Sequence, residues 1–297
     1  MIDKLQFLLA LARTRHFGQA AQMCGVTQPT LSSGIKQFED MLGIVLVNRG
    51  SRFHSFTPEG ERILEWARRI VGDANALKQE VQALKQGLSG HLRIAAVPPA
   101  LAMVAQLTVP YHVRHPEVTF TVLTRTSTQI DALFENLEID AALTYDASET
   151  AGRLRGVPLY REHYRLLTAK DGPLANREEV TWAEVGEVPL CLLTPDTQNR
   201  RIIDDCLAAA GCVSAPRLVS DSMIVLFAHV HSGRWSTVMP AGLSEVLGLA
   251  GQVNVVPIAG GEPSPTISLV VPRREPLPPL TAALVVEARR LSEQLLR

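Results

Sequence analysis

Apolar residues recur every three or four positions along the N-terminal part of the chain, which predicts a small helical domain. The chain opens on an amphipathic helix whose apolar residues are Leu5, Leu8, Leu9 and Ala12. A second short helix is expected over 17–24, and Gly25 makes a turn after it. Thr27 is a suitable N-cap for a third helix that ends at Gly43. The expected buried stripe of this helix is Leu31, Ile35, Phe38 and Leu42.

A hairpin and a long helix are predicted next. Two short β-type runs flank residues 50–51, and Thr57 with Pro58 is a typical helix start. The apolar positions of the long helix then alternate steps of four and three: Ile63, Ala67, Ile70, Ala74, Leu77, Val81, Leu84 and Leu88. A heptad seam of this length is typical of paired helices. The alternative is a helix lying along its own domain, which calls for a wider apolar stripe, so we favour pairing in a homodimer.

The stretch "GLSGH" at 87–91 breaks the helix, and an α/β pattern follows. Strand-like runs lie at 92–97, 119–124, 140–145, 164–169, 189–194, 236–240, 254–258 and 267–271. Helical stretches lie between them at 100–115, 129–137, 199–210 and 223–233. Such alternation predicts a mostly parallel sheet covered by helices, and the length from residue 92 onward suits two subdomains.

Composition and charge narrow the class of protein. A chain of 297 residues with 46% hydrophobic side chains has room for two or three domains. The net charge is −1, but residues 1–58 hold six Lys/Arg against three acids, which makes that part +3. Only the N-terminal domain is therefore basic, and mildly so.

Several functional classes find no support in the sequence. The four cysteines form no CxxC pair and have no histidine at metal-ligand spacing, so we expect buried reduced thiols and no metal. No phosphate loop or nucleophile elbow is present, so we expect neither an enzyme nor a cofactor. The N-terminus is a poor signal peptide and no segment reaches spanning length, which predicts a cytoplasmic protein without a membrane partner. Without an export signal, a secreted solute-binding protein is also disfavoured.

The third helix carries the clearest chemical pattern. A helix, a turn and a second helix with a polar leading face form the helix-turn-helix arrangement, in which the second helix enters the DNA major groove. Its amide, hydroxyl and amino side chains can hydrogen-bond base edges or phosphates. The alternative is a generic helical domain with a solvated polar face. The candidate DNA-binding residues, including two arginines at the hairpin, are Thr27, Gln28, Pro29, Thr30, Ser32, Ser33, Lys36, Arg49 and Arg52.

The stretch "AAQMCGVTQPTLSSGIKQFEDMLGIVLVNRG", followed by "TPEG", resembles the DNA-binding domain of LysR-type transcriptional regulators. The resemblance continues through "VRHPEVTFTV", "ENLEIDAAL", "PLYREHYRLLTAKDGPLA" and "HSGRWSTVMPAGL". Some positions depart from the family pattern. Ser33 stands where a longer side chain is common, Gly34 costs about 1 kcal/mol inside a helix, and Arg234 replaces a frequent glycine.

The resemblance implies a fold class and a domain order. It implies an α/β multidomain chain with a winged helix-turn-helix over 1–58, a dimerisation helix and hinge over 59–90, and an effector-binding domain over 91–297. The last resembles periplasmic binding proteins and has two α/β subdomains, about 92–162 with 267–297 and about 163–266. The implied function is an effector-responsive activator of a metabolic operon. The implied partners are operator DNA with dyad symmetry, RNA polymerase and further copies in a homodimer that assembles into a homotetramer.

Loops that follow strands are the candidate effector site, because ligands of such sheets bind at strand C-terminal ends and helix N-termini. We expect a small carboxylate, with formate as one candidate that no residue establishes, to bridge the loops at 126–128 and 194–200. Ordinary helix capping is the alternative for each hydroxyl. The candidate residues are Pro98, Pro99, Thr126, Ser127, Thr128, Thr194, Asp196, Thr197, Gln198, Asn199 and Arg200.

Overall fold

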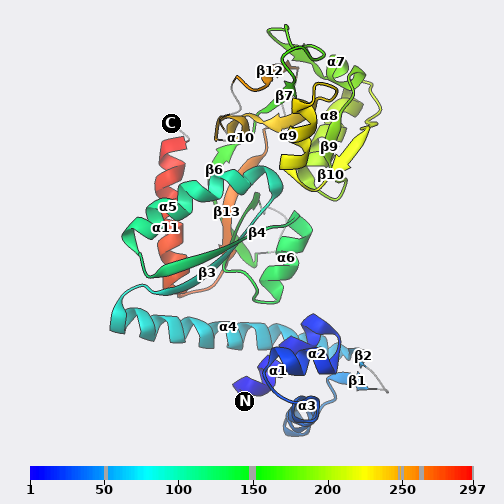
Figure 1. The fold of residues 1–297 in the computed structure, drawn as a ribbon. Coiled ribbons are helices and arrows are strands. Elements are labelled where there is room, and N and C mark those ends of the chain that lie inside the picture. The colour runs from blue at the N-terminus through cyan, green and yellow to red at the C-terminus, as the bar shows by residue number, and fades with distance from the viewer. Residues whose placement is uncertain (50–52, 147–151, 247, 249–250, 261–263, 296–297) are drawn as a thin grey trace. The chain divides into compact units, whose positions relative to one another are not determined.

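The computed structural model describes residues 1–297 except 50–52, 147–151, 247, 249–250, 261–263 and 296–297. The chain divides into two compact units. One comprises Met1–Gly87 with Ala132–Glu138, and the other comprises Leu88–Asp131 with Ile139–Arg297. Figure 1 shows the order of the helices and strands along the chain.

The N-terminal unit is a helical domain with a two-stranded hairpin. The hairpin strands pair antiparallel, as the sequence predicts. The elements are α1 (Ile2–Thr14), α2 (Phe17–Met23), α3 (Gln28–Leu42), β1 (Val47–Arg49), β2 (Phe53–Phe56) and α4 (Pro58–Gln86).

Local signals in the sequence fix the ends of α3. The Thr27 hydroxyl accepts a hydrogen bond from the Thr30 N–H, and Gly43 closes the helix in the left-handed conformation with a φ of 70°. Leu31, Ile35 and Phe38 are buried as predicted. The fourth predicted position, Leu42, is wrong, because its side chain is 39% exposed.

Glu39 takes the buried place near the end of α3. Its side chain is 8% exposed, and Oε1 accepts hydrogen bonds from the N–H groups of Leu46 at 2.9 Å and Val47 at 3.1 Å. These donors would otherwise be unpaired where the chain enters β1. A buried carboxylate is stable here because backbone N–H groups solvate it.

The start of α4 is locked onto the segment before β1. The Thr57 hydroxyl donates to the Val45 carbonyl at 2.7 Å and accepts from the Gly60 N–H at 2.9 Å. A Cβ on Gly60 would lie 2.1 Å from the Leu46 carbonyl oxygen, so only glycine allows this approach. The "TPEG" stretch is therefore a packing joint between α4 and the hairpin.

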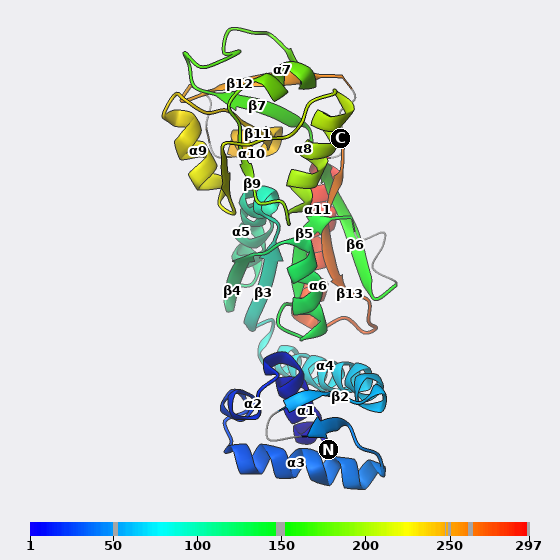
Figure 2. The same ribbon diagram turned by 90° about the vertical axis from the view of Figure 1, so that its right-hand side faces the viewer.

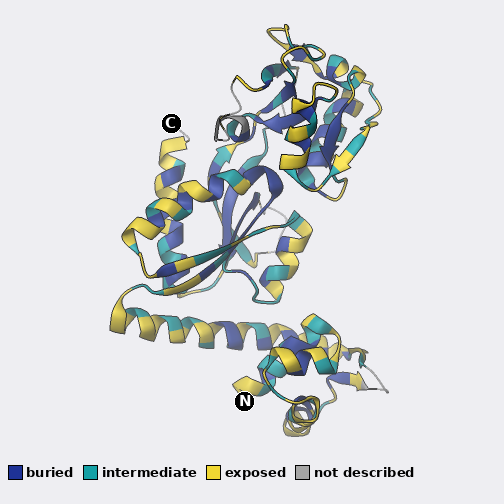
Figure 3. Ribbon diagram, viewed as in Figure 1, coloured by how far each residue is buried: buried dark blue, intermediate teal, exposed yellow. Residues whose placement is uncertain are grey.

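The two halves of α4 differ in burial. In the first half, Leu64, Ala67 and Val71 are buried in the same core as α1 and α3, and Ile63 and Ile70 pack against that core. This wider stripe matches the alternative of a helix lying on its own domain. In the second half the apolar side chains are exposed, with exposed fractions of 65% for Leu77, 42% for Val81 and 79% for Leu84. Figure 3 shows the change from buried to exposed along the helix. Leu88 lies beyond the helix, which ends at Gln86.

The larger unit contains a five-stranded sheet in the order β4-β3-β5-β13-β6. Helices α5 (Val104–Arg114) and α11 (Pro279–Leu295) lie on one face of this sheet and α6 (Ser127–Glu135) on the other (Figures 1 and 2). A 3-10 helix, η1 (Pro98–Met103), leads into α5. The strands are β3 (Gly90–Ala96), β4 (Val118–Thr124), β5 (Ala141–Tyr145), β6 (Leu154–Arg161) and β13 (Thr266–Pro272).

A second sheet has the order β11-β7-β12-β8, and a separate parallel pair joins β9 to β10. The strands are β7 (Tyr164–Thr168), β8 (Val180–Thr181), β9 (Cys191–Leu193), β10 (Leu218–Ser220), β11 (Thr237–Pro240) and β12 (Asn254–Ala259). The helices are α7 (Trp182–Glu187), α8 (Gln198–Ala209), α9 (Met223–His231) and α10 (Ala241–Val246).

The predicted mostly parallel sheet is wrong, because both larger sheets are mixed. β3 pairs in parallel with β4 and β5, whereas β13 pairs antiparallel with β5 and β6. In the second sheet β7 is antiparallel to both of its neighbours. The chain crosses between the sheets twice, and the two crossings meet where the Glu162 N–H donates to the Pro265 carbonyl at 2.9 Å.

Candidate nucleic-acid interface and effector loops

The outer face of α3 is polar and exposed. Gln28, Pro29, Thr30, Ser33 and Lys36 are exposed, whereas Leu31, Ile35 and Phe38 of the same helix are buried. This is the arrangement that the helical spacing predicts.

Three polar side chains on this face have no hydrogen-bond partner among the described residues. Gln28, Ser33 and Lys36 make no side-chain hydrogen bond or ion pair within the part of the chain that the structure describes. Thr27 and Thr30 differ, because their hydroxyls lie 2.9 Å apart and belong to the helix cap. Ser32 is half-buried. The amide, hydroxyl and ammonium groups that remain can therefore hydrogen-bond base edges or phosphates without losing an internal bond.

The hairpin is the candidate wing. β1 and β2 pair with an irregularity in register between Asn48 and Arg49, and Arg49 is the last residue of β1. Arg52, the second predicted wing residue, lies outside the described residues. Of the two predicted wing arginines, the described backbone therefore includes only Arg49.

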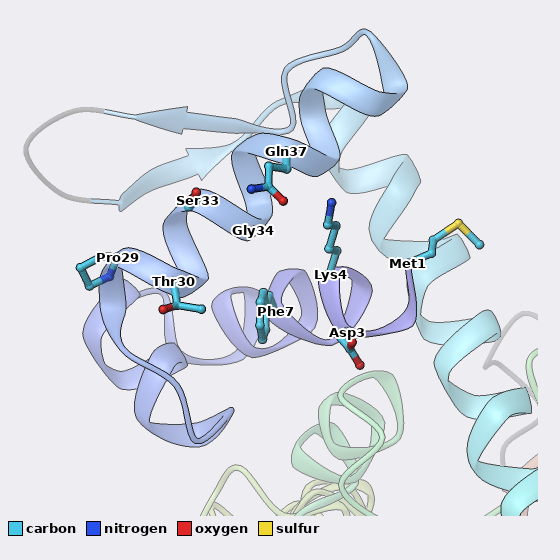
Figure 4. A pocket seen from close by; sticks show the side chains of 9 residues that line it. All are labelled: Met1, Asp3, Lys4, Phe7, Pro29, Thr30, Ser33, Gly34 and Gln37. Atoms are coloured by element: carbon cyan, nitrogen blue, oxygen red, sulfur yellow. The ribbon is translucent and has the colours of Figure 1, made fainter.

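A groove of about 570 Å³ runs between α1 and the flank of α3 (Figure 4). Gly34 lies at the floor of the groove, and a Cβ at this position would be only 2.8 Å from the Phe7 ring. Glycine is unfavourable inside a helix, but here it allows α1 to approach α3 closely. The sequence gives no reason to single out Lys4, because its place beside α3 depends on tertiary packing. The lining residues are Met1, Asp3, Lys4, Phe7, Pro29, Thr30, Ser33, Gly34 and Gln37.

The first predicted effector segments open helices in the five-stranded half of the larger unit. Pro98 and Pro99 start η1 and are buried. Ser127 starts α6, and its hydroxyl lies 3.3 Å from the Thr144 hydroxyl of β5. The Thr126 hydroxyl accepts from the Gln129 N–H, and Thr128 is exposed.

The second effector loop is largely used by its own subdomain. The Thr197 hydroxyl caps α8 by accepting from the Arg200 N–H and donates to the Thr194 carbonyl at 2.8 Å. The Arg200 guanidinium, with 9% of its side chain exposed, donates to Asp204 at 2.7 Å and to the Leu193 carbonyl at 3.0 Å. Its charge is therefore neutralised internally.

The remaining residues of this loop range from buried to exposed. Asn199 is 2% exposed and its side chain interacts with the Tyr164 hydroxyl, whereas Asp196 is exposed and Gln198 half-buried. Within the described residues, no hydrogen bond joins this loop to 126–128. The structure brings together the members of each loop and shows no direct bond between the two loops.

Sequence reasoning missed Glu162, which lies at the crossing between the sheets. Its side chain is 1% exposed, and Oε2 accepts from the hydroxyls of Tyr145 at 3.1 Å and Tyr164 at 2.9 Å. Burial raises the pKa of Glu162 to about 7, against the lowering effect of the two hydrogen bonds. Burial also raises the pKa of both tyrosines, so their hydroxyls remain protonated donors. The sequence signal was limited to Tyr164, two residues after Glu162, because Tyr145 reaches the carboxylate from a distant strand.

Three of the four cysteines are in surroundings that disfavour the thiolate form. Burial raises the pKa of Cys191 to about 11, and burial also raises the pKa of Cys24 and Cys206. A thiolate is the reactive form of cysteine, and reactive thiols have lowered pKa values in electropositive, accessible places.

None of the helices in the described part of the chain combines the length and apolar character that a membrane span requires.

Two family models match the chain. "Bacterial regulatory helix-turn-helix protein, lysR family" matches residues 2–61, and "LysR substrate binding domain" matches residues 85–292. The hydrogen peroxide-inducible genes activator of Dickeya chrysanthemi is 30% identical over 278 residues, which cover 93% of this chain and 90% of that protein.

Solved structures share the fold over nearly the whole chain. A full-length cysteine-to-aspartate variant of OxyR from Pseudomonas aeruginosa matches with a TM-score of 0.74 and 24% identity, covering 97% of each chain. Full-length CbnR in complex with its target DNA matches with a TM-score of 0.61 and 21% identity, covering 98% of this chain and 99% of that one.

Proposed function

The chain belongs to the LysR family of DNA-binding transcriptional regulators, and from this premise we propose that it is an effector-responsive activator that reads operator DNA with α3 and the β1–β2 wing. The observation that carries the proposal is the outer face of α3, where Gln28, Ser33 and Lys36 are exposed and make no side-chain bond to any other described residue, above a buried apolar stripe. In helix-turn-helix proteins the N-terminal residues of the recognition helix contact base edges, and Gln28 and Ser33 lie in that part of α3. The wing arginines Arg49 and Arg52 supply phosphate contacts.

Binding of promoter DNA should depend on these side chains and on salt. We expect Lys36→Ala to weaken binding to every duplex alike, whereas Gln28→Ala should mainly reduce the preference for the operator, because amides read bases and lysines read charge. An electrophoretic mobility shift across ionic strengths, with an operator duplex selected from a random-sequence pool and a scrambled duplex of equal length as probes, measures both effects. Wild-type protein whose affinity does not fall with salt would contradict DNA binding through this face.

The effector is proposed to be a small carboxylate held by the two loops that open α6 and α8. Each helix has a partly positive N-terminal end at its own loop, and the first loop adds the hydroxyls of Thr126 and Ser127. Arg200 is not part of the proposed contact set, since its guanidinium is paired with Asp204. Thermal shift with formate and larger carboxylates, against matched neutral alcohols, tests the class. Stabilisation by the alcohols alone would contradict it, and Ser127→Ala should reduce the carboxylate effect.

Peroxide is the second candidate effector, because the curated relative above is named as a peroxide-inducible activator. The raised pKa of Cys24, Cys191 and Cys206 argues against oxidation of these three thiols as the signal. We therefore expect hydrogen peroxide to leave DNA binding and the mass of the thiols unchanged over minutes. Rapid formation of a sulfenic acid or disulfide, detected by alkylation and mass spectrometry, would favour peroxide sensing instead.

The proposal includes an assembly. The exposed apolar side chains of Leu77, Val81 and Leu84 give α4 a surface for a second copy, and a homodimer, with a homotetramer built from it, would place several α3 helices on one operator. Contact with RNA polymerase and a cytoplasmic location follow from the activator role. We also propose that the DNA-binding domain ends at residue 58 and that the dimerisation helix and hinge end at residue 90.

A further inference from the structure

The groove between α1 and α3 continues the outer face of α3. Thr30, Ser33 and Gln37 form its α3 wall, and two of these also belong to the surface described above for base contact. The opposite wall is the N-terminal half of α1, with Lys4 directed toward Gln37 in Figure 4. Lys4 is half-buried and makes no ion pair within the described residues.

A helix in the DNA major groove leaves little room at its sides. The helix with its side chains is about 10–12 Å across, and the major groove is about 12 Å wide. The tip of the helix therefore faces base edges, while each flank faces one phosphate backbone. Groups that stand beside the flank of α3 are within reach of phosphates rather than bases.

We propose that the α1 wall of this groove binds a backbone phosphate of DNA, with Lys4 as its cation and Gln37 as a hydrogen-bond donor. The inference rests on the proposed function of α3 and adds a contact from a helix that does not enter the major groove. Charge complementarity supports a phosphodiester as the occupant. Asp3 also lines the groove, but its carboxylate points away from α3 in Figure 4.

Gly34 and Phe7 determine the geometry of this contact. Because Gly34 lacks a Cβ, the Phe7 ring packs directly against α3 and brings the α1 backbone close to it. The Lys4 side chain, one helical turn before Phe7, then reaches the level of α3 with its apolar stem against the protein and its ammonium group outward. A bulkier residue at position 34 would separate α1 from α3 and withdraw the ammonium group.

The test uses the full chain and a fluorescein-labelled 30-base-pair duplex of random sequence, with anisotropy measured over a series of KCl concentrations. Each phosphate contact contributes about 0.9 to the slope of log affinity against log salt. Lys4→Gln should lower the slope by about that amount, which corresponds to about an eightfold loss of affinity at 0.1 M salt. Lys4→Arg should retain the slope, and Asp3→Asn should strengthen binding.

Lys170→Gln is the matched control, since it removes the same charge from an exposed lysine in the larger unit. Its slope should equal that of the wild type. A Lys4→Gln slope equal to the wild type, with a normal melting temperature, would overturn the inference while leaving DNA reading by α3 intact. Wild-type protein without any salt-dependent binding of the duplex would instead contradict the proposed function itself.

Discussion

Polar side chains on the outer face of α3 and at the start of α8 differ in their bonding. On α3, Gln28, Ser33 and Lys36 are exposed and make no internal bonds in the described structure. At α8, Thr197 and Arg200 are buried and bonded to their own subdomain. Polar residues on a helix can therefore be either available to an external partner or committed to internal packing. Burial and existing partners separate the two cases.

The α3 surface depends on a rigid joint behind it, and Gly60→Ala should break that joint. The added Cβ would lie 2.1 Å from the Leu46 carbonyl oxygen, a backbone atom that cannot move aside without displacing the hairpin. We expect a loss of about 3 kcal/mol or more, at the upper end of overpacking effects. Calorimetric melting of the N-terminal unit measures it. Gly242→Ala is the control, because nothing lies within 4 Å of a Cβ there, and equal melting of the two variants would refute the joint.

The difference between an exposed side chain on α3 and an internally bonded side chain on α8 can be tested by comparing Lys36→Ala with Arg200→Ala. Removing Arg200 leaves the Leu193 carbonyl without that donor and Asp204 without its cation, which should cost about 2 kcal/mol, discounted because Asp204 is 34% exposed. Lys36→Ala should change stability by less than about 0.5 kcal/mol while weakening DNA binding. Chemical denaturation and mobility shifts on both variants provide the measurements. Equal destabilisation by the two substitutions would contradict the expectation that Arg200 stabilises the fold and Lys36 does not.

Glu162 extends the contrast to a buried charge. The unfolded chain titrates this carboxyl near 4.5 and the folded chain at about 7, so the folded form binds the extra proton between these values. The stability contributed by Glu162 therefore falls as pH rises from about 4.5 to about 7. At pH 8, Glu162→Gln should stabilise the larger unit by on the order of 1 kcal/mol, because removal of buried charge outweighs weaker tyrosine hydrogen bonds.

Melting temperatures of Glu162→Gln and wild type from pH 5 to pH 8 test this expectation. The two curves should approach each other at pH 5, where the wild-type carboxyl is protonated. A gap that is constant across the range would mean that the carboxyl does not titrate in it. Glu184→Gln, at an exposed capping position with a lowered pKa, is a control that should not give a gap opening between pH 5 and pH 8.

The smallest expected effect is at Gly34. Alanine there gains about 1 kcal/mol of helix propensity but places its Cβ 2.8 Å from the Phe7 ring, so the net change should be within about 1 kcal/mol of zero. Phe7→Leu combined with Gly34→Ala should be more stable than the sum of the single changes predicts. A double-mutant cycle by thermal denaturation measures the coupling, and strict additivity would show that the ring does not limit position 34.

Much of the N-terminal unit could be predicted because its signals are local. The caps at Thr27 and Thr57 and the apolar steps along α3 all act within a few residues. Leu42 was mispredicted because Glu39, with two backbone donors from the chain entering β1, takes the buried position. That compensation comes from a segment that follows the helix and has no periodic signal.

The larger unit was harder because its pairing is not local. β6 contains Gly156 and Pro158, which weaken a strand pattern but are tolerated at the edge of the five-stranded sheet. The direction of β13 depends on where the chain re-enters the sheet, which no periodicity encodes. For the effector loops, the sequence shows polar residues after strands. It does not show whether Arg200 is available to a ligand or paired with Asp204 inside the subdomain. The groove beside Lys4 depends on how α1 packs against α3.

The exposed ridge of Leu77, Val81 and Leu84 has a consequence for gene dosage. If two copies must associate through this ridge before an operator with two half-sites is filled, the fraction of occupied operators rises with about the square of protomer concentration while dimers are scarce. Halving expression would then reduce promoter output about fourfold in that range. The same apolar side chains that lack a partner within the described chain would make the cellular response to this regulator steep.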